Sequence, residues 1–444
     1  MKILFKVPIL LTCILIIWMC SHYFFPLSST VSATYSAESS HFSSFHITND
    51  GVTDDRFSEL DRQMTQFLSK ENLMGGASVS VSHQGQLIYS KGYGWADREK
   101  GIAVEPSQLF RVASVSKLLT GVGVMKLVEQ GVLSLDDKVF GPEGILNDSV
   151  YLNYLDKRVE KITVFQLLNH SGGWTTRWGD PMFMSQVIAA KQQIPLPINM
   201  EDIIVYMLSK RLHFEPGTSS SYSNFGFAIL GEVISKVAGM PYEKFIQSQI
   251  LYPLGIFDMR LGRSYKEERL DLEVKYYESD TLYLVDDFCG RDEKVRRSYG
   301  GTDIHTLGAA GGWVASSTDL MKLLLALDGF PQVPDILSET SLKTMADNHN
   351  NQFSPLGWRK TDENGWYRTG TLAGSSALLV RRIDGVNYVV VLNCANHKGP
   401  SLANEIHKVM EKSLRTIGSW PNRDLFENDQ AWANYKLRVP DYIN

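Results

Sequence analysis

Cysteine is scarce in this chain, with four residues among 444. Cys13 and Cys20 lie in an apolar stretch at the N-terminus, while Cys289 and Cys394 are far apart in sequence. Two thiols are too few for a disulfide scaffold, and no Cys/His spacing resembles a zinc site. One disulfide and two free thiols both remain open for this pair.

Basic residues are not in excess, because 44 Lys and Arg residues stand against 49 Asp and Glu residues, a net charge of −5. Proteins that bind nucleic acid usually carry a clustered positive charge. The one short basic run, at 294–297, follows two acidic residues and is typical of a solvated face. We therefore expect no nucleic-acid partner.

Three common catalytic motifs are missing as well: Gly-x-Ser-x-Gly, His-Glu-x-x-His and a phosphate-binding Gly-rich loop. Their absence argues against a Ser-His-Asp hydrolase and a metalloprotease. We expect neither a metal nor an organic cofactor.

The N-terminus has the pattern of a secretion signal. Lys2 and Lys6 precede an almost wholly apolar stretch at 7–25, and the small residues at 31–33 suit cleavage. The apolar stretch is also nearly long enough to span a bilayer, so an uncleaved membrane anchor is the alternative. Both interpretations predict an extracytoplasmic protein, either periplasmic or secreted.

Two kinds of periodicity divide the rest of the chain. Strand-like alternation with hairpin turns occurs near both ends, at 77–92 and 377–393, the second around Asp384-Gly385. Helical periodicity dominates 111–255, and helices are also expected at about 57–68 and 402–414. This order predicts an α/β fold of the α+β kind: an antiparallel sheet of five or more strands flanked by helices, plus an all-helical subdomain.

The expected segments follow from these patterns. They are a signal peptide or anchor at 1–33, a tether at 34–52, a folded domain at 53–415 and a tail at 416–444. Within the domain, we assign about 53–110 and 300–415 to the sheet and about 111–299 to the helical subdomain. The tail has no clear periodicity, so Trp420 and Trp432 either pack back on the domain or contact a partner.

Ser114 and Lys117 form the first candidate for chemistry. Residues three apart share one helix face, so the Lys117 ammonium can reach the Ser114 hydroxyl. A serine is a poor nucleophile until a neighbouring base or cation eases the loss of its proton. The apolar run that follows predicts a buried helix with Ser114 near its N-terminus, where the dipole favours an alkoxide. The alternative is a serine cap followed by a surface lysine.

Tyr222-Ser223-Asn224 is the second candidate, placed between a Pro-Gly turn and an apolar helix at 225–237. A tyrosine there can relay a proton if a cation lowers its pKa, and an asparagine amide can orient a carbonyl or a lysine. The alternative for Tyr222 is a half-buried aromatic residue at a helix start.

Arg368-Thr369-Gly370-Thr371 is the third candidate, at the entry to the second hairpin. A glycine in a strand lets a substrate approach the backbone closely. A cation and a hydroxyl beside it can hold a carboxylate or polarise an oxyanion. The alternative is an ordinary edge strand with a salt-bridged arginine.

Taken together and in this order, the three candidates resemble the serine hydrolases that include class C β-lactamases, serine D-Ala-D-Ala carboxypeptidases and related esterases. The resemblance covers about 57–415. It extends to connecting segments, which are Phe110-Arg111-Val112-Ala113, Leu167-Leu168-Asn169-His170-Ser171-Gly172-Gly173, Phe214-Glu215-Pro216-Gly217, Pro253-Leu254-Gly255-Ile256 and Ala310-Gly311-Gly312-Trp313-Val314. It implies a β-lactamase/transpeptidase-like fold with the active site between the sheet and the helical subdomain.

The same resemblance implies roles for individual residues. Ser114 would be the acylated nucleophile, Lys117 its immediate partner and Tyr222 the proton shuttle to the leaving group. Asn224 would bind the substrate amide, and the backbone N–H groups of Ser114 and Thr371 would form the oxyanion hole. The partner implied is a small-molecule or peptide substrate.

One position departs from the family pattern. Class C β-lactamases carry Lys-Thr-Gly and many relatives carry His-x-Gly, whereas this chain has Arg368-Thr369-Gly370. Because arginine grips carboxylates but does not exchange protons, we expect an amide, peptide or ester substrate with a free carboxylate, such as a D-amino peptide. A β-lactamase, an esterase and a binding protein that has lost turnover are the alternatives.

Overall fold

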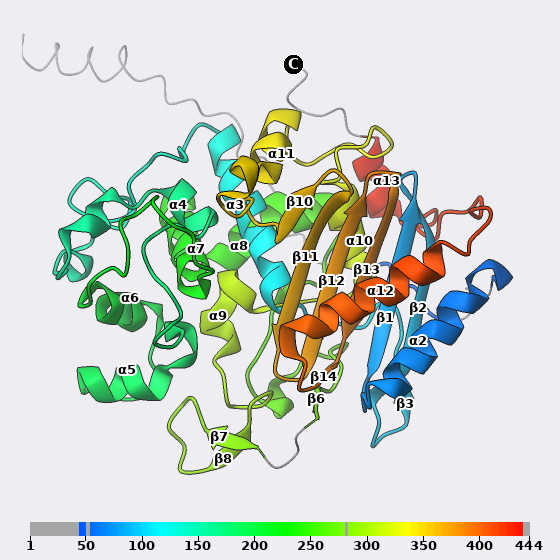
Figure 1. Cartoon of the computed structure of the whole chain (residues 1–444), viewed down its shortest axis with the longest axis horizontal. Coiled ribbons are helices and arrows are strands. Elements are labelled where there is room, and N and C mark those ends of the chain that lie inside the picture. The colour runs from blue at the N-terminus through cyan, green and yellow to red at the C-terminus, as the bar shows by residue number, and fades with distance from the viewer. Residues whose placement is uncertain (1–43, 50–53, 280–282, 438–444) are drawn as a thin grey trace, which may run out of the picture. The chain divides into compact units, whose positions relative to one another are not determined.

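A seven-stranded antiparallel sheet, in the order β10-β11-β12-β13-β1-β2-β3, forms one side of the fold (Figure 1). The structure is a computed structural model, and it describes residues 44–49, 54–279 and 283–437. The strands are β1 (Gly76–His83), β2 (Gln86–Asp97), β3 (Ile102–Ala103), β10 (Lys360–Asp362), β11 (Gly365–Leu372), β12 (Ser375–Arg382) and β13 (Val386–Leu392). The predicted fold class and both predicted hairpins, β1–β2 and β12–β13, are confirmed.

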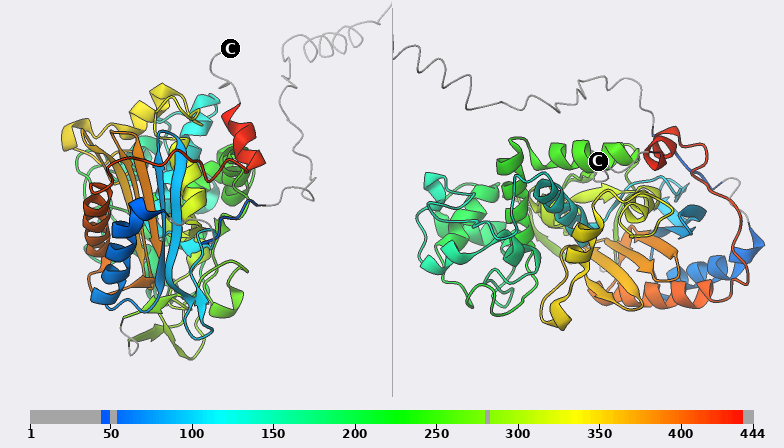
Figure 2. Two further views of the ribbon diagram at one scale, coloured as in Figure 1. Left: turned by 90° about the vertical axis from the view of Figure 1, so that its right-hand side faces the viewer. Right: turned by 90° about the horizontal axis from the view of Figure 1, so that it is seen from above.

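Strands β1 and β13 pair within the sheet although more than 300 residues separate them in sequence, with Ala77 opposite Leu392 and His83 opposite Val386. Both strands are buried almost throughout, so the sheet is covered on both faces. Helices α2 (Ser58–Lys70) and α12 (Leu402–Leu414) cover one face, as the edge-on view in Figure 2 shows.

Helix α10 (Ser317–Leu325) covers the other face of the sheet. Here β1 presents Ser78 and Ser80, whose hydroxyls lie 2.6 and 2.8 Å from the hydroxyl of Ser317. These hydrogen bonds satisfy polar groups that would otherwise destabilise the core.

The helical side of the molecule packs around α3 (Ser116–Glu129), which is buried on nearly every face. The other helices are α4 (Val164–Leu168), α5 (Ser185–Gln192), α6 (Met200–Leu208), α7 (Asn224–Ala238), α8 (Tyr242–Ile246), α9 (Ile304–Gly311), α11 (Glu339–Ala346) and α13 (Gln430–Lys436). The expected helices at 57–68, 225–237 and 402–414 correspond to α2, α7 and α12.

Several short strands were not expected from the pattern, because two or three residues are too few to show a period. They are β4 (Phe110–Arg111), β5 (Arg260–Leu261), β6 (Tyr277–Glu278), β7 (Leu284–Asp286), β8 (Lys294–Arg296), β9 (Trp313–Ala315) and β14 (Cys394–Ala395). The set β4-β9-β5 links the segment before Ser114 to the segment after α9.

The C-terminal segment packs on the domain, which decides between the two alternatives for its tryptophans. Trp432 is fully buried, and Trp420 stacks on His83 with ring centroids 5.2 Å apart. Cys289 and Cys394 are free thiols, so they do not form the disulfide that the sequence left open.

The predicted signal peptide or anchor at 1–33 lies outside the described residues. Residues 44–49 belong to the predicted tether and contact the domain, where the N–H of Ile47 donates to the Ser107 hydroxyl at 2.7 Å. Within the part of the chain that is described, no helix has the length and apolar character to cross a membrane.

We expect Trp432→Ala to lower the free energy of unfolding by about 3–5 kcal/mol, because it leaves a large cavity under the C-terminal segment. Urea unfolding followed by circular dichroism measures this loss. Trp178→Ala is the matched control, since Trp178 is 72% exposed and its loss should cost less than about 0.5 kcal/mol. Equal effects of the two changes would contradict the tight packing of the segment.

Candidate active site

Ser114 lies in a 3₁₀ turn (Ala113–Val115) that leads directly into α3. Ala113 has a φ of +49°, a conformation that residues with a side chain rarely adopt. Ser116 holds this turn, because its hydroxyl donates to the Ala113 carbonyl at 2.7 Å and accepts from the Trp313 N–H at 3.2 Å. The strained turn presents the Ser114 hydroxyl at the N-terminal end of α3.

Lys117 lies one turn further along and is fully buried. Its ammonium donates to the Ala310 carbonyl at 2.5 Å, to Asn224 Oδ1 at 2.6 Å and to Ser114 Oγ at 3.4 Å. Burial lowers the pKa of Lys117 to about 8, although the adjacent Tyr222 opposes that change.

Tyr222 approaches Ser114 from the segment before α7, and its hydroxyl donates to Ser114 Oγ at 2.7 Å. Burial alone would raise the pKa of this phenol, but the nearby cations Lys117 and Arg368 bring it down to about 8. A group with a pKa near the working pH can both take and return a proton.

Arg368, on β11, is also buried, and it bonds mainly to the protein itself. Its Nε donates to the Ser114 carbonyl at 2.7 Å, Nη1 to the Trp358 carbonyl at 3.2 Å and Nη2 to the Tyr222 hydroxyl at 3.4 Å. Three of its five N–H groups are thus directed at Ser114, Trp358 and Tyr222 rather than at a substrate. Its positive charge lowers the pKa of the Tyr222 phenol.

Gly370 permits the close approach of β11 to the serine turn. A Cβ at this position would lie 2.1 Å from the Val112 carbonyl oxygen and 3.1 Å from the Ser114 nitrogen. Any side chain would therefore force the strand away from Ser114. Thr369 and Thr371 flank the glycine and line the same hollow as Ser114.

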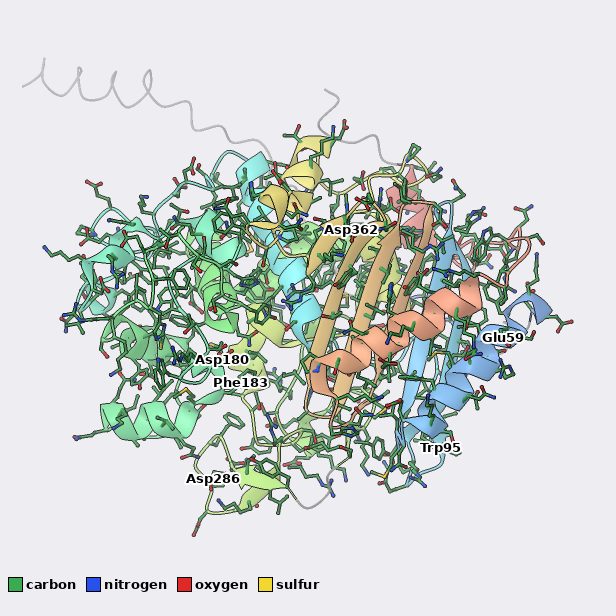
Figure 3. All side chains as sticks on the ribbon, in the orientation of Figure 1. Glu59, Trp95, Asp180, Phe183, Asp286 and Asp362 are labelled. Atoms are coloured by element: carbon green, nitrogen blue, oxygen red, sulfur yellow. The ribbon has the colours of Figure 1, made fainter. Side chains whose placement is uncertain are left out.

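Asn224 is the first residue of α7 and connects Lys117 to a residue that the sequence did not reveal. Its Nδ2 donates to Asp180 Oδ2 at 2.7 Å, while its Oδ1 accepts from Lys117. Figure 3 labels Asp180 and, nearby, Phe183 from the same turn. An Asp-Pro pair suggests a helix cap, which gives no signal of a role at a distant lysine.

The hollow at Ser114 has a volume of about 320 Å³. It lies between the sheet and the helical side, and β11 and α9 contribute to its walls. Its lining consists of Ala113, Ser114, Phe183, Tyr222, Asn224, Leu307, Ala310, Gly311, Arg359, Arg368, Thr369, Thr371, Leu372 and Pro400. All the predicted site residues except Lys117 and Gly370 therefore reach one cavity, and those two lie directly behind it.

His170 packs under Tyr222, with ring centroids 4.7 Å apart, and its Nδ1 accepts the Ser223 N–H at 3.2 Å. Burial and the nearby cations hold the pKa of His170 well below its usual range, so the ring is neutral. Among the described residues, no cluster of three or more His, Cys, Asp or Glu side chains could hold a metal ion.

A family model described as Beta-lactamase matches residues 60–409. The chain belongs to the β-lactamase family. The predicted family membership is thereby confirmed.

One curated sequence relative and two solved structures illustrate what this chain is similar to. Penicillin-binding protein 4* of Bacillus subtilis (strain 168) is 29% identical over 217 residues, covering 47% of this chain and 44% of that protein. The chain thus matches less than half the length of this curated relative.

Two solved structures show the same fold. The octameric penicillin-binding protein homologue from Pyrococcus abyssi has a TM-score of 0.60 at 24% identity, covering 80% of this chain and 77% of that one. D-amino acid amidase from Ochrobactrum anthropi SV3 has a TM-score of 0.63 at 20% identity, covering 82% and 99%.

Removing the Arg368 charge should shift the pH dependence of Ser114 reactivity. In Arg368→Met the Tyr222 phenolate loses a neighbouring cation, so its pKa rises. The acid limb, which is the part of the pH profile where the labelling rate rises with pH, therefore moves to higher pH by about one unit or more. The rate of labelling by a fluorophosphonate between pH 6 and 10 measures the shift. Arg177→Met removes an exposed arginine instead and should leave the profile in place; a shift of the same size there would contradict the local effect.

Proposed function

We propose that the protein is an extracytoplasmic serine hydrolase that forms an acyl-enzyme on Ser114 and acts on a small amide, peptide or ester. The observation that carries this proposal is the position of Ser114 Oγ, 2.7 Å from the Tyr222 hydroxyl and 3.4 Å from the Lys117 ammonium. A nucleophile between a proton acceptor and a buried cation meets the geometric requirements of acyl transfer. The apolar stretch at 7–25 supports the extracytoplasmic part, as a cleaved signal or an anchor.

The proposed reaction begins when Tyr222 takes the proton of Ser114 and the serine oxygen attacks the substrate carbonyl. The N–H groups of Ser114 and Thr371 then stabilise the oxyanion, an arrangement that commonly contributes about 10²- to 10³-fold in rate. Tyr222 returns the proton to the leaving group as the carbonyl bond to it breaks. Water then attacks the acyl-enzyme carbonyl while Tyr222 takes its proton. Tyr222 passes this proton to Ser114 Oγ as the ester bond breaks, which releases the acid. The Asn224 amide contributes to substrate binding.

Arg359 is the cation that faces a substrate in this hollow. Its side chain is exposed, lines the cavity and lies 5.7 Å from the centre of the Tyr222 ring. Arg368, by contrast, is buried and directed at protein acceptors. We therefore assign the substrate carboxylate to Arg359 with the hydroxyls of Thr369 and Thr371, and we assign Arg368 to the support of Tyr222.

The rest of the cavity favours a substrate with an apolar group next to the reacting carbonyl. Phe183, Leu307, Leu372 and Pro400 provide this wall. A D-amino peptide or amide has such a group, and one protein with this fold carries the name D-amino acid amidase. The names of other relatives refer to penicillin binding, so a β-lactam is the second substrate class to test.

Covalent labelling tests the nucleophile. Intact-protein mass spectrometry with a fluorophosphonate and with a fluorescent penicillin should show one adduct, and Ser114→Ala should abolish it. Slow loss of a penicilloyl adduct would indicate a peptidase-like enzyme, and fast loss a β-lactamase. Absence of any adduct in the native protein would contradict the acyl-enzyme and favour a binding protein without turnover.

Arg359→Ala should raise KM by about tenfold for a D-alanyl peptide with a free carboxylate, since it removes a charge-assisted hydrogen bond. KM for the same peptide with an amidated C-terminus should not change. Steady-state kinetics on the matched pair measure the difference. Arg177→Ala is the control for the loss of an exposed arginine, and an equal rise in KM for both peptides would exclude carboxylate recognition by Arg359.

A further inference from the structure

Asp180 lies outside the predicted site, yet each of its two carboxylate oxygens accepts a hydrogen bond. It precedes the 3₁₀ turn η5 (Pro181–Phe183), and Oδ1 accepts the N–H of Met182 at 3.0 Å. Oδ2 accepts from Asn224 Nδ2 at 2.7 Å. One side chain thus caps the turn and also reaches the start of α7, 44 positions away in sequence.

The chemistry of the two neighbours determines which way the Asn224 amide points. A lysine ammonium has only donors, so the Asn224 oxygen must face Lys117, at 2.6 Å. A carboxylate has only acceptors, so the Asn224 nitrogen must face Asp180. The hydrogen-bonded series Asp180–Asn224–Lys117–Ser114 therefore has one direction, and reversing the amide would break two of its bonds.

We propose that Asp180 is a positioning residue of this hydrolase: its carboxylate holds the Asn224 amide in the orientation that accepts the Lys117 ammonium. The inference rests on the proposed acyl-enzyme chemistry of Ser114. Without this carboxylate, the amide can turn its nitrogen towards Lys117, and the ammonium then loses one of its three acceptors.

The negative charge of Asp180 and its hydrogen bond to Asn224 both favour the charged form of Lys117. The groups that face Lys117 or its neighbour Tyr222 are Arg368 on β11, Arg359 at the cavity rim and the neutral His170 below. Tyr222 raises the pKa of Lys117 against the effects of burial and Arg368, and the negative charge of Asp180, the carboxylate of the group, adds to that rise.

Two variants separate positioning from folding. Asp180→Asn keeps the oxygen that caps η5 but presents an NH₂ group to Asn224, which forces the amide to reverse. Adding Asn224→Asp restores an acceptor both for Lys117 and for the amide introduced at position 180, and it leaves the net charge of the native site. The readout is the rate of fluorophosphonate labelling of Ser114 in the full chain, measured from pH 6 to 10.

We expect Asp180→Asn to lower the plateau rate by about tenfold and to move the acid limb to lower pH, because an anion near Lys117 is lost. The double variant should recover most of the plateau and move the limb back to higher pH, since its carboxylate touches Lys117 directly. The matched control is Asp54→Asn, at the capping residue of a similar 3₁₀ turn (Asp55–Phe57), where Asp54 accepts the Arg56 N–H.

The outcomes distinguish this inference from the proposed function. If the native protein does not label at Ser114, the acyl-enzyme proposal fails first. If it labels and Asp180→Asn has the native profile, or the double variant shows the same limb and plateau as the single variant, Asp180 has no positioning role. A lower plateau with an unmoved limb in both variants would indicate only a structural cap and would overturn the inference. Should Asp180→Asn fail to fold, the double variant decides by its plateau: a rate near the native one supports the pairing of positions 180 and 224, and a rate at the level of Ser114→Ala overturns it.

Discussion

The buried ammonium of Lys117 is the constraint on which the site depends. A charge removed from water is stable only if nearby dipoles replace its hydration, and each of its three N–H bonds needs an acceptor. The chain provides these from three segments: the Ala310 carbonyl near the end of α9, the Asn224 amide at the start of α7 and the Ser114 hydroxyl before α3. Helices α3, α7 and α9 must therefore meet at this point.

A second buried cation makes this electrostatic environment unusual. Arg368 and Lys117 flank Tyr222. Arg368 disfavours the charged form of Lys117, and both cations favour the phenolate between them. The same field holds His170 neutral directly beneath the ring. The two cations bring the pKa of Tyr222 down to about 8, and the deprotonated form is the one that takes the proton of Ser114 in the proposed reaction.

Sequence reasoning predicted the fold from local patterns, whereas the proposed role of Ser114 as the nucleophile also required the resemblance to a family. Ser114 and Lys117 are related by helix geometry, and the two hairpins by alternation and turn residues. Tyr222 and Asn224 required the resemblance to a family, since their spacing alone is not specific. Asp180, Arg359 and the partners of Arg368 could not be predicted, because these contacts join segments that neither periodicity nor a motif relates. The burial of Trp432 likewise follows from tertiary packing alone.

The hydrogen-bond partners of Arg368 explain why an arginine suits this position. A guanidinium is planar and has donors on three nitrogens, so it can bond the Ser114 carbonyl, the Trp358 carbonyl and the Tyr222 hydroxyl together. An ammonium at the end of a shorter side chain could not span these three acceptors. The substitution of the family's lysine or histidine thus ties β11 to the serine turn while keeping a positive charge beside Tyr222. This is why our proposal assigns the substrate carboxylate to Arg359, which also lines the hollow.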